Sequence, residues 1–142
     1  MLNVEAYWIS PVGKIMEVEQ RHIVTICNHP EWFGLEKKYL EKIFKKHKEP
    51  TGWEGVARGE IMTELMKKNW IRVRYVERPT KWVIEFWQRN ELVKNHILKF
   101  INIMIKKDKN FKFNDIQLNS VKSDSTLSYN VKEILKKGFF NA

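Results

Sequence analysis

The sequence predicts a single α+β domain, because stretches with two different apolar periodicities follow one another along the chain. Residues 70–87 alternate between apolar and polar side chains with a period of two, which is typical of a β-hairpin. Residues 35–48 and 91–107 repeat apolar side chains every three or four positions, as amphipathic helices do. At 142 residues and 43% hydrophobic content, the chain is long enough to bury a core without disulfide bonds or metals.

The first elements are a β-hairpin and a short helix. Residues 6–9 and 14–18 are apolar-rich, and the segment between them contains proline and glycine, so we expect two strands joined by a turn. Residues 19–27 then predict a short helix. It should end before Pro30, because the residue that precedes a proline is disfavoured in the helical region.

Two longer helices are expected next. Residues 35–48 place their apolar side chains on one face, and residues 51–68 do the same. Thr51 and Glu54 have the spacing of a capping box, in which each side chain satisfies a free amide at the start of a helix. The outward positions of the earlier helix carry a face of lysines: Lys37, Lys38, Lys42, Lys45, Lys46 and Lys48.

The clearest pattern in the chain is the hairpin of residues 70–76 and 82–87. If Pro79 and Thr80 are the two loop residues, the pairing of the strands follows directly. It predicts an Arg74–Glu85 ion pair and a contact of Arg72 with an aromatic ring on one face of the hairpin. The expected partners are Tyr75 with Ile84, Val73 with Phe86, Arg74 with Glu85, and Arg72 with Trp87.

The C-terminal third should form a helix, a strand and a short terminal helix, at residues 91–107, 111–118 and 130–137, with a polar loop at residues 119–128. The apolar surface of the first of these helices is wide, which indicates either near-complete burial or packing against a second copy. We therefore expect a homodimer to form through its inward stripe, which consists of Val93, Ile97, Phe100, Ile101 and Met104.

The order helix, helix, hairpin is that of a winged-helix core. On this interpretation residues 1–88 form the core, residues 51–68 take the recognition position and residues 70–87 form the wing. Residues 89–142 then form a basic appendage that is compact with the core. Three glutamates on the would-be recognition helix would repel phosphates, so we do not expect base-specific readout.

The charge balance favours a polyanionic partner. The formal net charge is +9, from 26 basic and 17 acidic residues, and such a surplus attracts nucleic acid, nucleotide phosphates or an acidic protein. The same surplus also occurs in Lys-rich and Asn-rich chains that have no binding role. Aromatic residues beside arginines can stack a base, although they can equally form a core with the cations at its edge. The candidate binding residues are Arg58, Arg72, Arg74, Arg78, Lys81 and Trp82.

No catalytic or metal-binding pattern emerges from the sequence. Cys27 and His29 lack a second ligand pair, Glu60 and Glu64 are more typical of a solvated helix face, and no phosphate-binding glycine loop is present. We therefore expect a non-enzymatic protein without metal or cofactor. A lone cysteine, no signal-peptide pattern and no long apolar segment predict a soluble cytoplasmic protein that does not bind membranes.

Five short stretches together resemble a group of small, uncharacterised bacteriophage-encoded accessory proteins. They are Tyr7-Trp8-Ile9-Ser10-Pro11-Val12-Gly13-Lys14-Ile15, Arg21-His22, Phe33-Gly34-Leu35, Glu54-Gly55-Val56-Ala57-Arg58 and Trp70-Ile71-Arg72-Val73-Arg74. The resemblance covers residues 7–87 and contains no catalytic signature. It implies a viral origin and a host-cytoplasm location, with a shared surface formed by His22, Arg58, Arg72 and Arg74. It also implies an alternative function, in which the protein inhibits a host immune complex or sequesters a cyclic or other nucleotide signal.

Overall fold

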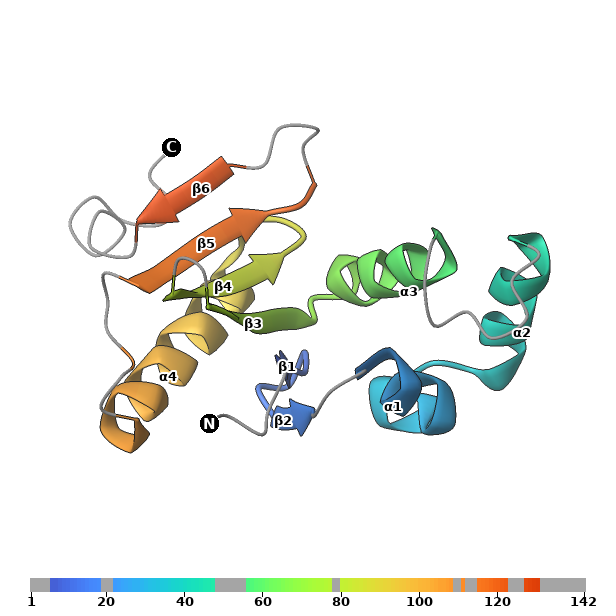
Figure 1. The fold of residues 1–142 in the computed structure, drawn as a ribbon, viewed down its shortest axis with the longest axis horizontal. Helices are drawn as coiled ribbons and strands as arrows, with labels where there is room; N and C mark the ends of the chain where they lie inside the picture. Colours follow the sequence, from blue (N-terminus) through green and yellow to red (C-terminus); the bar gives the residue numbers. More distant parts are fainter. Residues whose placement is uncertain are drawn as a thin grey trace.

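The computed structural model shows an α+β fold, as the sequence predicts. It describes residues 6–18, 22–47, 56–77, 80–108, 111, 115–122 and 127–130. The elements in chain order (Figure 1) are β1 (Ala6–Ile9), β2 (Ile15–Val18), α1 (His22–Asn28), the 3₁₀ helix η1 (Pro30–Phe33), α2 (Lys37–Lys46), α3 (Val56–Lys67), β3 (Ile71–Glu77), β4 (Thr80–Phe86), α4 (Glu91–Lys107), β5 (Ile116–Ser120) and β6 (Leu127–Asn130).

The strands form one six-stranded sheet in the order β2-β1-β3-β4-β5-β6. The N-terminal hairpin β1–β2 is confirmed, and β1 also pairs antiparallel with β3. Strands β4 and β5 are parallel neighbours, whereas the other adjacent pairs are antiparallel. Parallel strands need a long crossover connection, and α4 supplies it.

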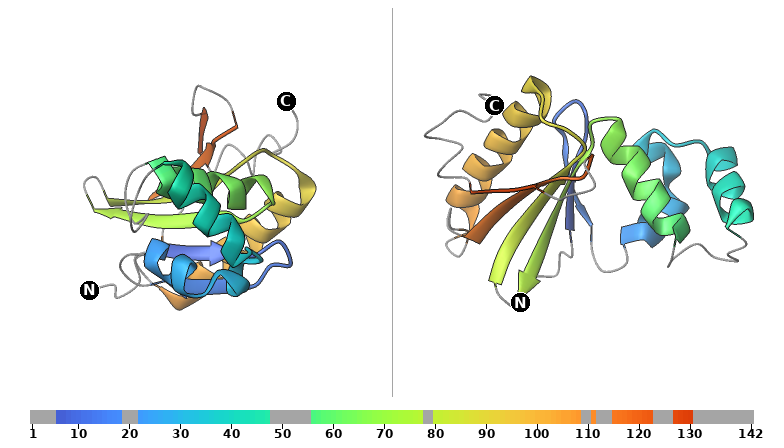
Figure 2. Two further views of the ribbon diagram at one scale, coloured as in Figure 1. Left: turned by 90° about the vertical axis from the view of Figure 1, so that its right-hand side faces the viewer. Right: turned by 90° about the horizontal axis from the view of Figure 1, so that it is seen from above.

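The sheet has helices on both sides, and each side has its own core. In the right panel of Figure 2, α4 lies on one side of the sheet while α1, α2 and α3 lie on the other. The core under α4 includes Tyr7, Ile9, Val73 and Ile84, and the core under the other helices includes Trp8. Neighbouring residues of β1 therefore serve opposite cores, because successive side chains of a strand point to opposite faces.

The predicted dimer surface on α4 is buried within the chain. The five residues of the stripe, Val93, Ile97, Phe100, Ile101 and Met104, are all buried in the core against the sheet. A second copy therefore cannot pack on them without unfolding this core. Among the described residues, no helix is both long enough and apolar enough to cross a membrane.

The central hairpin is confirmed, but its predicted register is wrong. Glu77 pairs with Thr80, so Arg78 and Pro79 connect the strands, instead of Pro79 and Thr80. Each residue of β3 consequently lies opposite a residue two positions earlier in β4 than predicted. Because side chains alternate with a period of two, this shift leaves every side chain on its predicted face. The observed partners include Arg72 with Glu85, Val73 with Ile84, Arg74 with Val83 and Tyr75 with Trp82.

The hairpin is not a projecting wing. Strand β3 is paired with β1 on its other edge, and β4 is paired with β5, so the hairpin forms the centre of the sheet. Strand β5 thus extends the same sheet, and α4 packs in the same core as β3 and β4. The residues described after position 88 are consequently integrated with the N-terminal part.

Other differences concern the C-terminal part and a few local contacts. Strand β5 begins at Ile116 rather than at residue 111, and β6 occupies part of the segment expected to be a polar loop. The contact expected between Arg72 and Trp87 is replaced by Lys67, whose ammonium lies 5.2 Å from the centre of the Trp87 ring. The terminal helix expected at residues 130–137 lies outside the described residues except for Asn130, which is the last residue of β6. The capping box of residues 51–54 also lies outside the described residues.

Candidate anion-binding site

Strands β3 and β4 place charged side chains on the sheet face opposite α4. Val73 and Ile84 point into the core under α4, so the alternating residues Arg72, Arg74 and Glu85 point to the other face. Helix α3 ends just before β3 begins, and it lies on this side of the sheet (Figure 2). Met62 of α3 accepts a hydrogen bond from Nη1 of Arg72, which places the helix directly against the charged residues.

One carboxylate oxygen accepts hydrogen bonds from two of the arginines. Oε1 of Glu85 accepts hydrogen bonds from Nε and Nη2 of Arg72, at 3.0 and 2.8 Å. The same oxygen accepts a hydrogen bond from Nε of Arg74 at 2.8 Å. The predicted Arg74–Glu85 ion pair is therefore present, although these two residues are diagonal neighbours and not direct partners.

Positive charge exceeds negative charge at this point. Burial lowers the pKa of Arg72, Glu85 opposes that change, and the nearby positive charges of Arg74 and Arg58 lower the pKa further. Arginine remains protonated in proteins, so three guanidinium groups lie within electrostatic range here, and two of them, those of Arg72 and Arg74, bond the carboxylate of Glu85. We call Arg58, Arg72 and Arg74 the arginine cluster.

Arg74 is the outward-facing member of the cluster. Its side chain is 39% exposed, whereas those of Arg72 and Glu85 are each only 12% exposed. The bond from Nε fixes the orientation of the guanidinium, and neither Nη atom of Arg74 bonds to another described residue. A guanidinium held in this way presents two parallel N–H donors, which is the geometry that binds phosphate or carboxylate with two hydrogen bonds.

The predicted site residues fall into three groups. Arg58, Arg72 and Arg74 are brought together, and Lys81 lies on the same face of β4 as Glu85, opposite Val76. Trp82 does not belong to the site, because it points to the other face and is 3% exposed in the core under α4. Arg78 lies outside the described residues, as does the side chain of His22, the first residue of α1.

A second basic surface lies on α2. Leu40 and Ile43 are buried against the other helices, which leaves the opposite side of α2 exposed. Four lysines on this side form no ion pair with a described residue, and they are Lys37, Lys38, Lys42 and Lys45. We call these four residues the lysine face.

Lys46, by contrast, is tied to α3. Its ammonium lies 3.2 Å from Oε1 of Glu60, while His47 hydrogen-bonds the second oxygen of the same carboxylate. The hydrogen bond from His47 and then that from Lys46 lower the pKa of Glu60. This three-residue contact links the end of α2 to α3.

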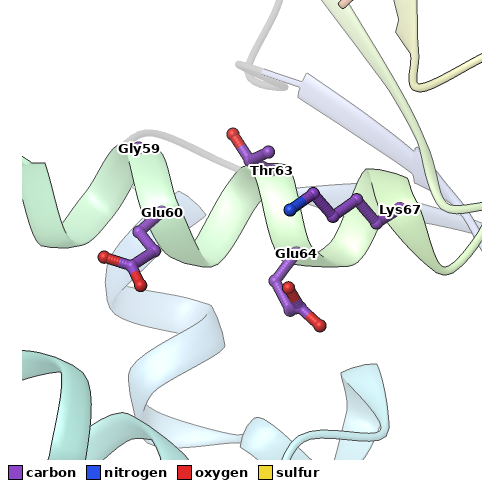
Figure 3. A pocket seen from close by; sticks show the side chains of 5 residues that line it. All are labelled: Gly59, Glu60, Thr63, Glu64 and Lys67. Atoms are coloured by element: carbon purple, nitrogen blue, oxygen red, sulfur yellow. The ribbon is translucent and has the colours of Figure 1, made fainter. Parts of the chain in front are cut away.

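The pair Glu60 and Glu64 lines a shallow pocket of about 440 Å³ on α3, together with Gly59, Thr63 and Lys67. Figure 3 shows both carboxylates pointing to the same side of the helix, as the sequence predicts. Burial, followed by the charges of Glu64 and Glu60, raises the pKa of the nearby Tyr39 hydroxyl to about 12. A carboxylate whose pKa is lowered and a phenol whose pKa is raised are both poorly suited to proton transfer near neutral pH.

Cys27 and the possibility of a metal site can also be judged from the described residues. Burial raises the pKa of the Cys27 thiol, which reduces the fraction present as the reactive thiolate. Within the described ranges, no group of three or more His, Cys, Asp or Glu side chains could hold a metal ion. The arginine cluster and the lysine face are therefore the strongest candidates for a functional surface.

Sequence reasoning missed one exposed aromatic pair. The rings of Trp32 and His29 stack with their centres 4.0 Å apart and an interplanar angle of 8°, and Trp32 is 53% exposed. Of the three tryptophans that lie beside the hairpin arginines in the sequence, Trp70 and Trp82 are buried and Trp87 is partly buried. A signal was available, because Trp32 lies between Pro30 and Gly34 in a segment too short to bury every aromatic side chain that it carries.

Comparisons with known proteins found no significant match to this chain. No family model matches the chain. Neither the curated proteins nor the solved structures include a significant match. The functional argument therefore depends on the residues themselves.

Proposed function

We propose that this protein is a non-enzymatic binding protein that engages nucleic acid through the arginine cluster, with the lysine face of α2 as a second contact. The observation that carries the proposal is the hydrogen bonding of the Arg74 guanidinium. Its Nε is bonded to Glu85 while its two Nη atoms remain available in a region of surplus positive charge. A phosphate group matches both the charge and the paired-donor geometry of this group.

The arrangement favours contact with the backbone of a nucleic acid over recognition of its bases. Phosphate contacts from arginine and lysine supply affinity and orientation, but they carry no sequence information. The four lysines of α2 add positive charge, and none of them forms an ion pair with a described carboxylate, although Glu41 lies on the same side of the helix. The proposal includes the phage origin that the sequence resemblance implies, with the host cytoplasm as the place of action.

The test is the salt dependence of binding to a short labelled oligonucleotide, for the wild-type protein and for Arg74→Gln. Wild-type affinity should fall by orders of magnitude between about 50 and 200 mM salt, because each phosphate contact releases a counterion. Arg74→Gln should bind more weakly and should reduce the slope of log Kd against log salt by about 1. Arg74→Lys retains the charge but loses the paired donors, so it should lie between the two.

Lys122→Gln provides the matched control. It removes one positive charge from an exposed side chain whose ammonium donates a hydrogen bond to Gln88 and to no described member of the arginine cluster. Its affinity and salt slope should equal those of the wild-type protein. An equal loss in Lys122→Gln and Arg74→Gln would show that net charge alone governs binding, and would contradict the proposed site.

The alternative functions give different outcomes in the same experiment. Capture of an enclosed nucleotide predicts binding to the mononucleotide with little dependence on salt. Inhibition of a host protein predicts that neither nucleic acid nor nucleotide binds at low salt. Either result would overturn nucleic-acid binding as the function of the arginine cluster.

A further inference from the structure

The exposed ring pair of Trp32 and His29 lies on η1, between α1 and α2. Large aromatic side chains are usually buried, and here Phe33, the next residue, is buried in the core while Trp32 remains 53% exposed. His29 covers one face of the indole ring. The large exposed fraction therefore belongs to the opposite face and the edges of the ring.

The pair is held in place by the backbone and by its neighbours. The amide of Trp32 donates to the carbonyl of His29 at 3.1 Å, which brings the two rings to the same side of the turn. The turn ends at Gly34, whose φ of +67° suits glycine, and the amide of Leu35 then bonds the carbonyl of Pro30 at 3.0 Å. The indole platform is thus ordered before any ligand arrives, which reduces the entropy cost of binding.

The platform adjoins the lysine face. Pro30 and Glu31 of η1 line the same surface hollow as Lys37, the first residue of α2. Nδ1 of His29 lies 3.6 Å from the carboxylate of Glu31, which follows Pro30 in η1. The segment that carries the ring pair therefore meets the lysine face at Lys37, the first residue of α2.

We propose that Trp32 is a base-stacking platform and that the ligand of the proposed function is single-stranded nucleic acid. This inference rests on the nucleic-acid binding proposed above and specifies its substrate class. Bases of a single strand can stack on the exposed face of Trp32 while the adjoining phosphates contact the lysine face. Bases within a duplex are already stacked on one another and cannot reach the ring.

The test compares a single-stranded oligonucleotide of about 12 nucleotides with the duplex of the same sequence, at one salt concentration. The wild-type protein should bind the single strand more tightly. Trp32→Ala should lose about tenfold in affinity for the single strand and should bind the duplex as the wild-type protein does. Trp32→Tyr keeps an aromatic face and should retain most of the preference, whereas Trp32→Leu keeps apolar bulk and should lose it.

Val12→Ala is the control for loss of an exposed apolar side chain, because Val12 is highly exposed on the turn between β1 and β2. Each variant should melt at the wild-type temperature, since Trp32 contributes little to the core. If Trp32→Ala binds the single strand as tightly as the wild-type protein, the platform is refuted while nucleic-acid binding stands. An equal loss for the single strand and the duplex would also refute it. If the wild-type protein binds neither oligonucleotide at low salt, the proposed function fails, and the platform with it.

Discussion

At the scale of single residues, the contact between Gly13 and His96 shows how closely α4 lies over the first turn. Gly13 has a φ of +85°, and a Cβ placed there would lie 3.1 Å from Nε2 of His96. Any other residue would therefore meet backbone strain and a tight contact with the His96 ring. Nδ1 of His96 is buried and has no hydrogen-bond partner among the described residues.

This environment predicts that acid destabilises the fold through His96. Burial, followed by the charge of Lys99, lowers the pKa of His96, so the folded state favours the neutral ring. The unfolded chain, with a histidine pKa near about 6.5, then binds the proton more readily. The free energy of unfolding should consequently fall as the pH drops through about 6.5, and urea denaturation between about pH 7.5 and pH 5 measures this loss.

The histidine responsible can be identified by substitution. His96→Gln should flatten the pH dependence over this interval, because the glutamine side chain does not titrate. His29→Gln is the comparison variant, because it removes a histidine whose side chain is exposed. A wild-type pH dependence that survives in His96→Gln would contradict the assignment.

At the scale of elements, the hairpin β3–β4 shows what alternation predicts and what it leaves open. The period-two pattern of residues 70–87 identifies both strands and the correct face for each side chain. It cannot distinguish registers that differ by two residues, because such a shift preserves every face. The pairing of Arg72 with Glu85 therefore could be determined only from the structure. The predicted Arg74–Glu85 ion pair still forms in the observed register, because arginine is long enough to reach a diagonal neighbour.

The same element predicts a sharp contrast between two substitutions. Among the residues that the structure describes, Glu85 supplies the only carboxylate that bonds Arg72 and Arg74, so Glu85→Gln leaves nearly buried positive charges to repel one another. It should lower the free energy of unfolding by about 3 kcal/mol, as expected when one partner of a buried ion pair is lost. Arg74→Gln should cost less than about 1 kcal/mol, because the Arg74 side chain is partly exposed and Arg72 remains paired.

Chemical denaturation of the two variants at neutral pH provides this measurement. Equal destabilisation would show that Arg74 contributes to the fold as much as Glu85 does, in contradiction of the exposures. The contrast also bears on the binding test. A stable Arg74→Gln protein with weakened oligonucleotide binding cannot owe that weakness to unfolding.

At the scale of the whole molecule, local patterns identify most elements but not their arrangement. The N-terminal hairpin, α2, the central hairpin and α4 follow from sequence periodicity, and the buried stripe of α4 is identified residue by residue. The insertion of β1 next to β3 and the parallel pairing of β5 with β4 join segments far apart in sequence, about which local spacing carries no information. Consequently Arg72 and Arg74 lie on one face of the hairpin, as the alternation predicts, whereas the candidate binding residue Trp82 lies in the core under α4.

This arrangement predicts that the two cores unfold together. Strand β1 contributes Tyr7 and Ile9 to the core under α4 and Trp8 to the other core, so neither can disassemble without disrupting the strand that both share. Phe100→Ala and Leu65→Ala each remove a fully buried side chain, one from each core. We expect losses of about 3–5 and 2–5 kcal/mol respectively, and a fall in melting temperature of roughly 10 °C in each.

The decisive feature is the shape of the transition. Far-ultraviolet circular dichroism reports helices on both sides of the sheet, and tryptophan fluorescence reports Trp8 and Trp70 in one core and Trp82 in the other. In both variants the two signals should change in a single, coincident transition, as for one cooperative unit. If residues 89–142 were instead an independent appendage, Phe100→Ala would give an early, separate loss of helical signal while the transition of the remaining structure kept its wild-type midpoint. The parallel β4–β5 pairing argues against that outcome, because loss of α4 removes the crossover that holds β5 against the centre of the sheet.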